Sequence, residues 1–283
     1  MAKQRLRQIE AVAECGQTRA YLRACAVRIG HFLFGYRDYL FPLALLLLAI
    51  TTKPTLFWGS ERLDEWVDAC GIIVALFGQG CRVLAVGSVE NIRRGGQQKR
   101  VAAGMLIQNG LYAHTRNPLY LGNLLIMTGL ALIVNAPAWH LLALPGFISV
   151  YWAIVLAEEN LLHRQFGRVY GDYCRRVPRF LPTLHGLRRS LTAEAFGWRR
   201  AFRKEMRIAY AWISVVLGLF IWERWEQFGY AARAAEIQIL GFVLFLGFVG
   251  FISVLWVQKN KRRHPRIPTW GGEKRPLPLS GAS

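Results

Sequence analysis

The sequence predicts an all-α, polytopic membrane protein with about six transmembrane helices. The chain has 283 residues, of which 53% are hydrophobic, and yet it carries a formal net charge of +19. Apolar and basic residues lie in alternating blocks, as is typical of a membrane protein. As helices, apolar segments of 17 to 21 residues would be about 26 to 32 Å long, close to the ~30 Å of a bilayer core. These segments lie at roughly 39–58, 66–86, 118–135, 138–157, 206–222 and 237–257.

The basic residues predict the orientation of these segments. Four segments hold 31 of the 36 lysines and arginines: 1–37, 88–116, 158–207 and 258–283. By the positive-inside rule these segments face the cytoplasm, and so do both termini, which agrees with an even number of spans. We expect an integral protein of a bacterial inner membrane or, in a eukaryote, of the endoplasmic reticulum. Topology and attraction to anionic lipid account for the charge, so we expect no nucleic-acid partner.

The third and fourth segments predict a helical hairpin. Asn117 is a favoured N-cap residue and Pro118 suits the first helical turn, so a helix should begin there. Asn135-Ala136-Pro137 should end this helix, and a second apolar run follows at once. Two antiparallel spans return the chain to its starting side. We therefore expect Arg116 and Glu159 to meet at one membrane surface.

An amphipathic helix should follow the hairpin. Phe166, Tyr170 and Tyr173 recur at i, i+4 and i+7, which places them on one stripe that can pack on the hairpin. This stripe either covers a ligand or serves packing alone, and the sequence favours neither. Arginines occupy the other face of the same helix.

The second segment contains an arginine and a pair of glycines. Arg82 within a span needs a partner and indicates function, unless its side chain snorkels to the membrane edge. Gly78 and Gly80 either allow close helix packing or approach a ligand. The five cysteines and six histidines show no spacing typical of metal ligands, so we expect no metal.

Two motifs carry a family resemblance. The first is Arg-Asn-Pro-x-Tyr-x-Gly over 116–122, and the second runs from Glu158-Glu159 through Phe166-Gly167 to Val177-Pro178. This pattern resembles the integral-membrane methyltransferases of the isoprenylcysteine carboxyl methyltransferase and phospholipid N-methyltransferase superfamily. The resemblance implies a cytoplasmic pocket for S-adenosylmethionine. It also implies methyl transfer to a membrane-embedded lipid or lipidated small-molecule acceptor.

The resemblance also implies the site residues. S-adenosylmethionine carries a carboxylate, an ammonium group and ribose hydroxyls, which match arginine, glutamate and tyrosine side chains. One glutamate should face the cofactor, and the other should support it or pair with Arg164 or Arg168; which does which stays open. An amine acceptor must lose a proton, for which a glutamate, His163 or water is a candidate. The implied catalytic residues are Arg116, Glu158 and Glu159, and the implied cofactor-binding residues are Leu106, Ile107, Tyr112, Arg116, Asn117, Pro118, Tyr120, Glu158 and Glu159.

With this resemblance, the chain divides into four parts. These are a cytoplasmic basic tail (1–38), a membrane methyltransferase core (39–190), two additional transmembrane helices (191–258) and a disordered basic tail (259–283). The N-terminal tail is either an interfacial amphipathic helix or a solvated segment. The C-terminal tail is rich in Pro, Gly and basic residues, which favours disorder.

The sequence departs from the family pattern at two places. Asn117 stands where many members have histidine, so no acid–base role can be assigned to it, although it can donate to a cofactor oxygen. The isoprenylcysteine enzymes also carry an arginine about one turn before the glutamates, and this chain lacks it. We therefore expect an amine or another non-carboxylate acceptor.

Two other classes of protein remain as alternatives. An NADPH-dependent membrane sterol-type reductase shows a pattern like Tyr173-Cys174-x-x-Val177-Pro178, but the two glutamates stand where such a reductase would need basic residues for the 2′-phosphate. A non-enzymatic membrane protein would bind no nucleotide. Cofactor binding would distinguish the three classes.

Overall fold

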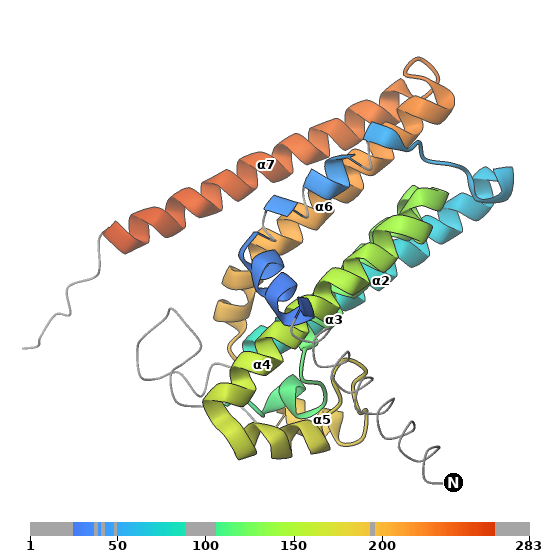
Figure 1. Ribbon diagram of the computed structural model, residues 1–283. Helices are drawn as coiled ribbons and strands as arrows, with labels where there is room; N and C mark the ends of the chain where they lie inside the picture. The colour runs from blue at the N-terminus through green and yellow to red at the C-terminus, as the bar shows by residue number, and fades with distance from the viewer. Residues whose placement is uncertain are drawn as a thin grey trace, which may run out of the picture.

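The protein is built from helices, as a computed structural model shows (Figure 1). The structure describes residues 25–36, 39–40, 43–47, 50–88, 106–192 and 196–263, and no β-strand occurs among them. Residues 25–36 are helical, and the rest of the predicted N-terminal tail and residues 264–283 of the C-terminal tail lie outside the described ranges. The elements are the 3-10 helices η1 (Phe57–Gly59) and η3 (Gly110–Ala113), the π-helix η4 (Trp139–Ala143), and the α-helices α2 (Glu61–Gly87), α3 (Pro118–Val134), α4 (Leu144–Arg176), α5 (Leu187–Thr192), α6 (Trp198–Phe228) and α7 (Ala234–Arg263).

Four helices are long and apolar enough to cross a membrane: Glu61–Gly87, Trp139–Arg176, Trp198–Phe228 and Ala234–Asn260. A fifth apolar helix, α3, has 17 residues, which at 1.5 Å per residue gives about 26 Å and nearly spans a bilayer core. The prediction of an all-α, polytopic membrane protein is therefore confirmed. In the first predicted span, described α-helical residues occur up to Thr51 and residues 52–56 are not helical, so the helix ends before the predicted boundary at residue 58.

Glycines bring α2 and α3 into close contact. A Cβ atom on Gly78 would lie 2.6 Å from the Gly122 carbonyl oxygen, and one on Gly71 would lie 2.7 Å from that of Gly129. A side chain at either position would force the two helices apart. Gly78 therefore serves helix packing, as one of the two interpretations predicted. No heavy atom lies within 4 Å of a Cβ built on Gly80.

The hairpin forms as predicted. Helix α3 ends at Val134, and Asn135 adopts a left-handed conformation with φ 47°. Its side-chain amide donates to the Thr55 carbonyl at 3.1 Å, and the Thr55 hydroxyl donates to the Asn135 carbonyl at 2.6 Å. These two bonds fix the far end of the hairpin. Beyond this turn, α4 runs back beside α3 toward the start of α3 (Figure 1).

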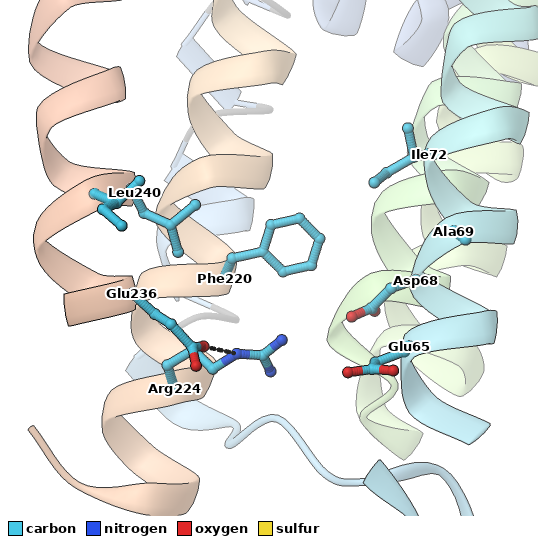
Figure 2. Close-up of a pocket in the computed structure, with 9 residues that line it drawn as sticks. Glu65, Asp68, Ala69, Ile72, Phe220, Arg224, Glu236 and Leu240 are labelled. Carbon is cyan, nitrogen blue, oxygen red and sulfur yellow. Dashed lines mark ion pairs between the residues drawn. The ribbon is translucent and has the colours of Figure 1, made fainter. Parts of the chain in front are cut away.

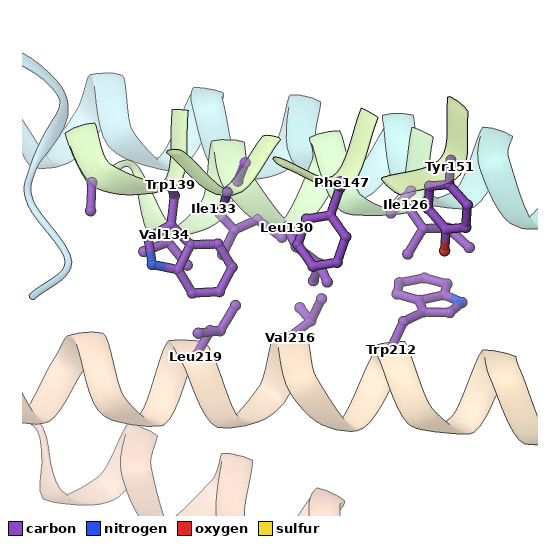
Figure 3. Packing of buried hydrophobic residues seen from close by; sticks show 14 of the residues in the cluster. Ile126, Leu130, Ile133, Val134, Trp139, Phe147, Tyr151, Trp212, Val216 and Leu219 are labelled. Carbon is purple, nitrogen blue, oxygen red and sulfur yellow. The ribbon is translucent and has the colours of Figure 1, made fainter. Parts of the chain in front are cut away.

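Helix α6 packs on the hairpin through apolar side chains. Trp212, Val216 and Leu219 of α6 face residues such as Leu130 and Phe147 of the hairpin (Figure 3). All five side chains are buried. The hairpin therefore has a hydrophobic core on its α6 side.

Arg82 of α2 completes the attachment of α6. Its Nε and Nη2 atoms donate to the Glu205 carboxylate at 2.7 and 3.1 Å, and Nη1 donates to Asn123 Oδ1 at 2.6 Å. Arg82 and Glu205 are 6% and 4% exposed, so the snorkelling interpretation is wrong. The predicted partner of this intramembrane cation is a carboxylate on α6.

Candidate active site

Arg116 lies at the entrance of α3, where the chain also passes the end of α4. Its backbone N–H donates to the Pro178 carbonyl at 2.9 Å. Its Nη1 lies 3.1 Å from Glu159 Oε1 and donates to Cys174 Sγ at 2.8 Å. The predicted meeting of Arg116 and Glu159 is thus confirmed. The Nε of Arg116 is buried and has no hydrogen-bond partner among the described residues.

Glu159 is held between two guanidinium groups. Arg179 donates from Nε to Glu159 Oε1 at 3.1 Å and from Nη2 to Oε2 at 2.7 Å. Its guanidinium also lies 5.1 Å from the centre of the Trp152 ring. This fork-to-fork geometry is the strongest form of arginine–carboxylate contact. We expected Arg164 or Arg168 to pair with one of the glutamates. Both are exposed on α4, and Arg179 pairs with Glu159.

Arg116 is positively charged in this site. Burial lowers the pKa of Arg116, but Glu159, Cys174 and Tyr170 together raise it by more, so the pKa is raised overall. Arg116 therefore stays charged. Arg116 and Arg179 together exceed the charge of Glu159 by one positive unit, which Glu158 or a bound carboxylate can balance.

Glu158 has a different partner. It accepts a hydrogen bond from the Tyr120 hydroxyl at 2.8 Å, and the Tyr120 ring lies 5.5 Å from that of Tyr151. Adjacent residues on a helix point about 100° apart, which explains why the two glutamates meet different groups. The two glutamates therefore have different contacts, and their different roles stay a prediction.

Asn117 and Pro118 begin α3 as expected, but the Asn117 side chain makes no capping bond. Its amide donates instead to the Arg179 carbonyl at 3.1 Å. Thr115 adds a hydroxyl bond to the Phe180 carbonyl at 2.9 Å. The loop before α3 is therefore fastened to the segment after α4, and this segment holds Arg179 in position.

The other predicted contacts lie beside this group. Leu106 packs against the cluster of Tyr170 and Tyr173, and the Tyr112 carbonyl accepts from the Tyr173 hydroxyl at 2.7 Å. The aromatic stripe of Phe166, Tyr170 and Tyr173 thus packs on residues 106–112. We expected it to pack on the hairpin, but it forms a cluster separate from the hairpin core. Ile107 is half-buried.

A cavity lies along the part of α4 that follows the two glutamates. Its volume is about 700 Å³, and its lining includes His163, Arg168 and Asp172. The helix breaks there at Gly167, where φ is +52°. His163 follows Glu159 by one helical turn, and its ring centre lies 6.0 Å from that of Tyr170. Small-molecule sites commonly have volumes of about 300–1,000 Å³, so this space is large enough for a cofactor.

Similarity to known proteins coincides with this region. Residues 67–169 match the model of the family described as phospholipid methyltransferase. The chain is 26% identical over 138 residues to protein-S-isoprenylcysteine O-methyltransferase of Rattus norvegicus, covering 48% of this chain and 49% of that protein. It is 32% identical over 125 residues to the nickel-cobalt-cadmium resistance protein NccN of Alcaligenes xylosoxydans xylosoxydans, covering 44% and 56%. No solved structure matches the chain.

The fold and the matched region define an integral-membrane protein whose core resembles the isoprenylcysteine and phospholipid methyltransferases. The resemblance that the motifs indicate is confirmed, since the match includes Arg116, Tyr120 and both glutamates. The chain spans about half the length of the curated relatives it matches. Helices α6 and α7 lie outside the family match, and so does Arg179.

Proposed function

We propose that the protein transfers a methyl group from S-adenosylmethionine to a membrane-embedded lipid or lipidated acceptor. One observation carries this proposal: Arg116, Tyr120 and the two glutamates converge at one end of the hairpin. The family match over 67–169 supports it independently.

The residues present suit the charged groups of S-adenosylmethionine. Arg116 has a buried Nε donor without a partner, which a ligand carboxylate could accept. Glu158 and Glu159 can accept from an ammonium group or a ribose hydroxyl. A cavity of about 700 Å³ lies further along α4, where His163 is the first residue of its lining. When bound, S-adenosylmethionine supplies an electrophilic methyl group on its sulfonium.

The protein's own residues then align the reactants and exclude water. Alignment of a nucleophile can contribute roughly 7–11 kcal/mol to a rate enhancement. In this proposal Arg116 binds the carboxylate of the donor, while Tyr120 orients Glu158 and Arg179 orients Glu159. A carboxylate acceptor would need no base. For an amine acceptor, Glu158 or His163 would take the proton that the nitrogen loses.

The structure broadens the class of acceptor that we consider. We expected a non-carboxylate acceptor because the arginine before the glutamates is missing. Arg179, which follows the glutamates in the sequence, nevertheless places a guanidinium beside Glu159. The missing arginine therefore no longer excludes an acceptor that carries a carboxylate. We propose a lipid or lipidated acceptor without specifying its nucleophile. Its tail would enter from the bilayer.

The site is proposed to face the cytoplasm. Ser88, the Gly110 turn, Arg116 and Gly197 gather at one end of the helices, since a Cβ on Gly110 would meet Ser88 and the Gly197 N–H donates to the Gly87 carbonyl. These residues belong to or border two of the basic segments. The positive-inside rule assigns that end to the cytoplasm.

One assay tests donor and acceptor together. Purified protein is incubated with methyl-labelled S-adenosylmethionine and either a total lipid extract or a farnesylcysteine derivative, and products are identified by mass analysis. We expect label in one of these acceptors. Saturable binding of NADPH without binding of S-adenosylmethionine would contradict the proposal and favour a reductase.

A further inference from the structure

Three carboxylates are buried at the end of α2 that lies farthest from Arg116. Asp64 and Asp68 belong to α2 and Glu223 belongs to α6. Their exposed fractions are 3%, 6% and 2%. One oxygen of each lies within 4.8 Å of an oxygen of both others. Three acids in one buried site require compensation, because an isolated buried carboxylate is strongly unfavourable.

Two of these carboxylates have an oxygen without a partner. Asp68 Oδ1 and Glu223 Oε2 are buried and accept no hydrogen bond from any described residue. The Phe57 N–H donates to Asp64 Oδ1 at 2.9 Å, and Gln227 Nε2 donates to Glu223 Oε1 at 3.3 Å. The side chains of Asp64 and Glu223 also share a hydrogen bond. The unpartnered oxygens lie within the same group of three acids. They leave acceptor capacity that a ligand can use.

Arginine does not neutralise this cluster. Arg224 Nη1 lies 3.8 Å from Glu223 Oε1, but its Nε lies 3.3 Å from Glu236 Oε2 on α7. In Figure 2 the Nε of Arg224 pairs with Glu236, and its terminal nitrogens point into the cavity, across which Asp68 lies on α2. With all three acids ionised, the single positive charge of Arg224 would leave two negative charges in the cluster without compensation.

A cavity connects the cluster to the surroundings. It measures about 430 Å³ between α2, α6 and α7, and Glu65, Asp68, Arg224 and Glu236 contribute to its lining (Figure 2). Asp68 therefore belongs both to the group of three acids and to the cavity wall. An ion entering this space would reach the carboxylates past polar side chains.

We propose that Asp64, Asp68 and Glu223 bind a hard divalent cation such as Mg²⁺, Mn²⁺ or Ca²⁺, which would tie α2 to α6. Carboxylate oxygens are the ligands that these ions prefer. Oxygens bound to one ion are at most about 4.2 Å apart for Mg²⁺ and about 5.2 Å apart for Ca²⁺. Separations within 4.8 Å therefore fit Ca²⁺ directly and the smaller ions after a small inward shift of the side chains. The expectation of no metal rested on cysteine and histidine spacing, which does not bear on an all-carboxylate site. This inference is independent of the proposed methyl transfer.

The test uses the full-length protein in detergent, stripped with EDTA and titrated with MnCl₂. Free Mn²⁺ is followed by electron paramagnetic resonance. We expect saturable binding of one Mn²⁺ per chain, displaced by excess MgCl₂ or CaCl₂, and an unfolding temperature that rises with MnCl₂. Asp68→Asn and Glu223→Gln should each weaken binding at least tenfold, about 1.4 kcal/mol.

Glu226→Gln is the matched control. Glu226 is an exposed acid on α6, one turn from Glu223, that pairs with Lys53 instead. Its substitution should leave Mn²⁺ binding unchanged. Should the Asp68 and Glu223 variants fail to insert, the wild-type titration decides alone. Absence of saturable binding would overturn the proposal, as would an infrared band of protonated carboxyl groups that Mn²⁺ does not remove, since protons would then supply the compensation.

Discussion

Arg179, in the segment that follows α4, donates two hydrogen bonds of 3.1 and 2.7 Å to the Glu159 carboxylate. Two further hydrogen bonds join the same segments. The Asn117 side-chain amide donates to the Arg179 carbonyl, and the Arg116 backbone N–H donates to the Pro178 carbonyl. Both arginines thus contact the same glutamate, and both contact its Oε1 atom. The consequence is that Glu159 has a fixed orientation before any ligand binds.

The role of Arg179 can be tested by substitution. Arg179→Ala removes both bonds to Glu159, and a charge-assisted bond contributes about 1.5–3 kcal/mol. We expect Arg179→Ala to weaken binding of S-adenosylmethionine and Arg179→Lys, which cannot form the fork, to weaken it less. Calorimetry measures both. Equal binding by wild type and Arg179→Ala would show that Glu159 needs no such support.

The ion pair of Arg82 and Glu205 should stabilise the attachment of α6. Removing one member of a buried pair leaves the other charged and uncompensated, at a cost of about 3–5 kcal/mol. We therefore expect Glu205→Gln to lower the unfolding temperature strongly, and Arg82→Met with Glu205→Met to lower it less than Glu205→Gln alone. Arg175→Ala, which breaks an exposed pair with Asp172, is the control. A double variant less stable than Glu205→Gln would contradict this account.

Close packing of α2 on α3 predicts unequal effects of two alanines. Gly78→Ala places a methyl group 2.6 Å from the Gly122 carbonyl oxygen, whereas Gly80→Ala meets no atom within 4 Å. Overpacking typically costs about 1–3 kcal/mol. Thermal unfolding in detergent should therefore show Gly78→Ala destabilised and Gly80→Ala close to wild type. Similar unfolding temperatures for the two variants would exclude the packing role.

The orientation of the site is open to chemical labelling. Cysteines introduced as Lys99→Cys and Arg188→Cys lie in basic segments that the positive-inside rule assigns to the cytoplasm. A membrane-impermeant maleimide added outside intact cells should label neither of them, and should label both after permeabilisation. Strong external labelling at either position would reverse the proposed orientation.

Much of this arrangement could be predicted from local signals in the sequence. Asn117-Pro118 marked the start of α3, and Asn135-Ala136-Pro137 marked the turn, so the meeting of Arg116 with Glu159 followed from two helices of similar length. Arg82 required a partner because a cation inside a membrane is unfavourable alone. Each of these inferences rests on chain geometry or on the cost of burial.

The contacts that sequence analysis missed depend on how distant segments fold back. Pro178 indicates that α4 ends, but the backbone direction after Val177 decides that Arg179 returns to Glu159. The aromatic stripe was periodic, yet periodicity does not identify the surface on which Tyr170 packs. The cluster of Asp64, Asp68 and Glu223 joins two helices that are far apart in sequence. No local pattern specifies such pairings.

The central claim is that the Arg116 and glutamate group binds S-adenosylmethionine, and calorimetric titration tests it most directly. Loss of a charge-assisted bond of about 1.5–3 kcal/mol corresponds to roughly 10- to 150-fold in affinity. We expect Arg116→Ala, and the double change Glu158→Gln with Glu159→Gln, to insert normally and to bind at least about tenfold more weakly. Arg164→Ala alters an exposed arginine on the same helix as the glutamates and should change affinity by less than about threefold. If the Arg116 and glutamate variants bind like wild type, the polar group is an interfacial anchor and the cofactor lies elsewhere.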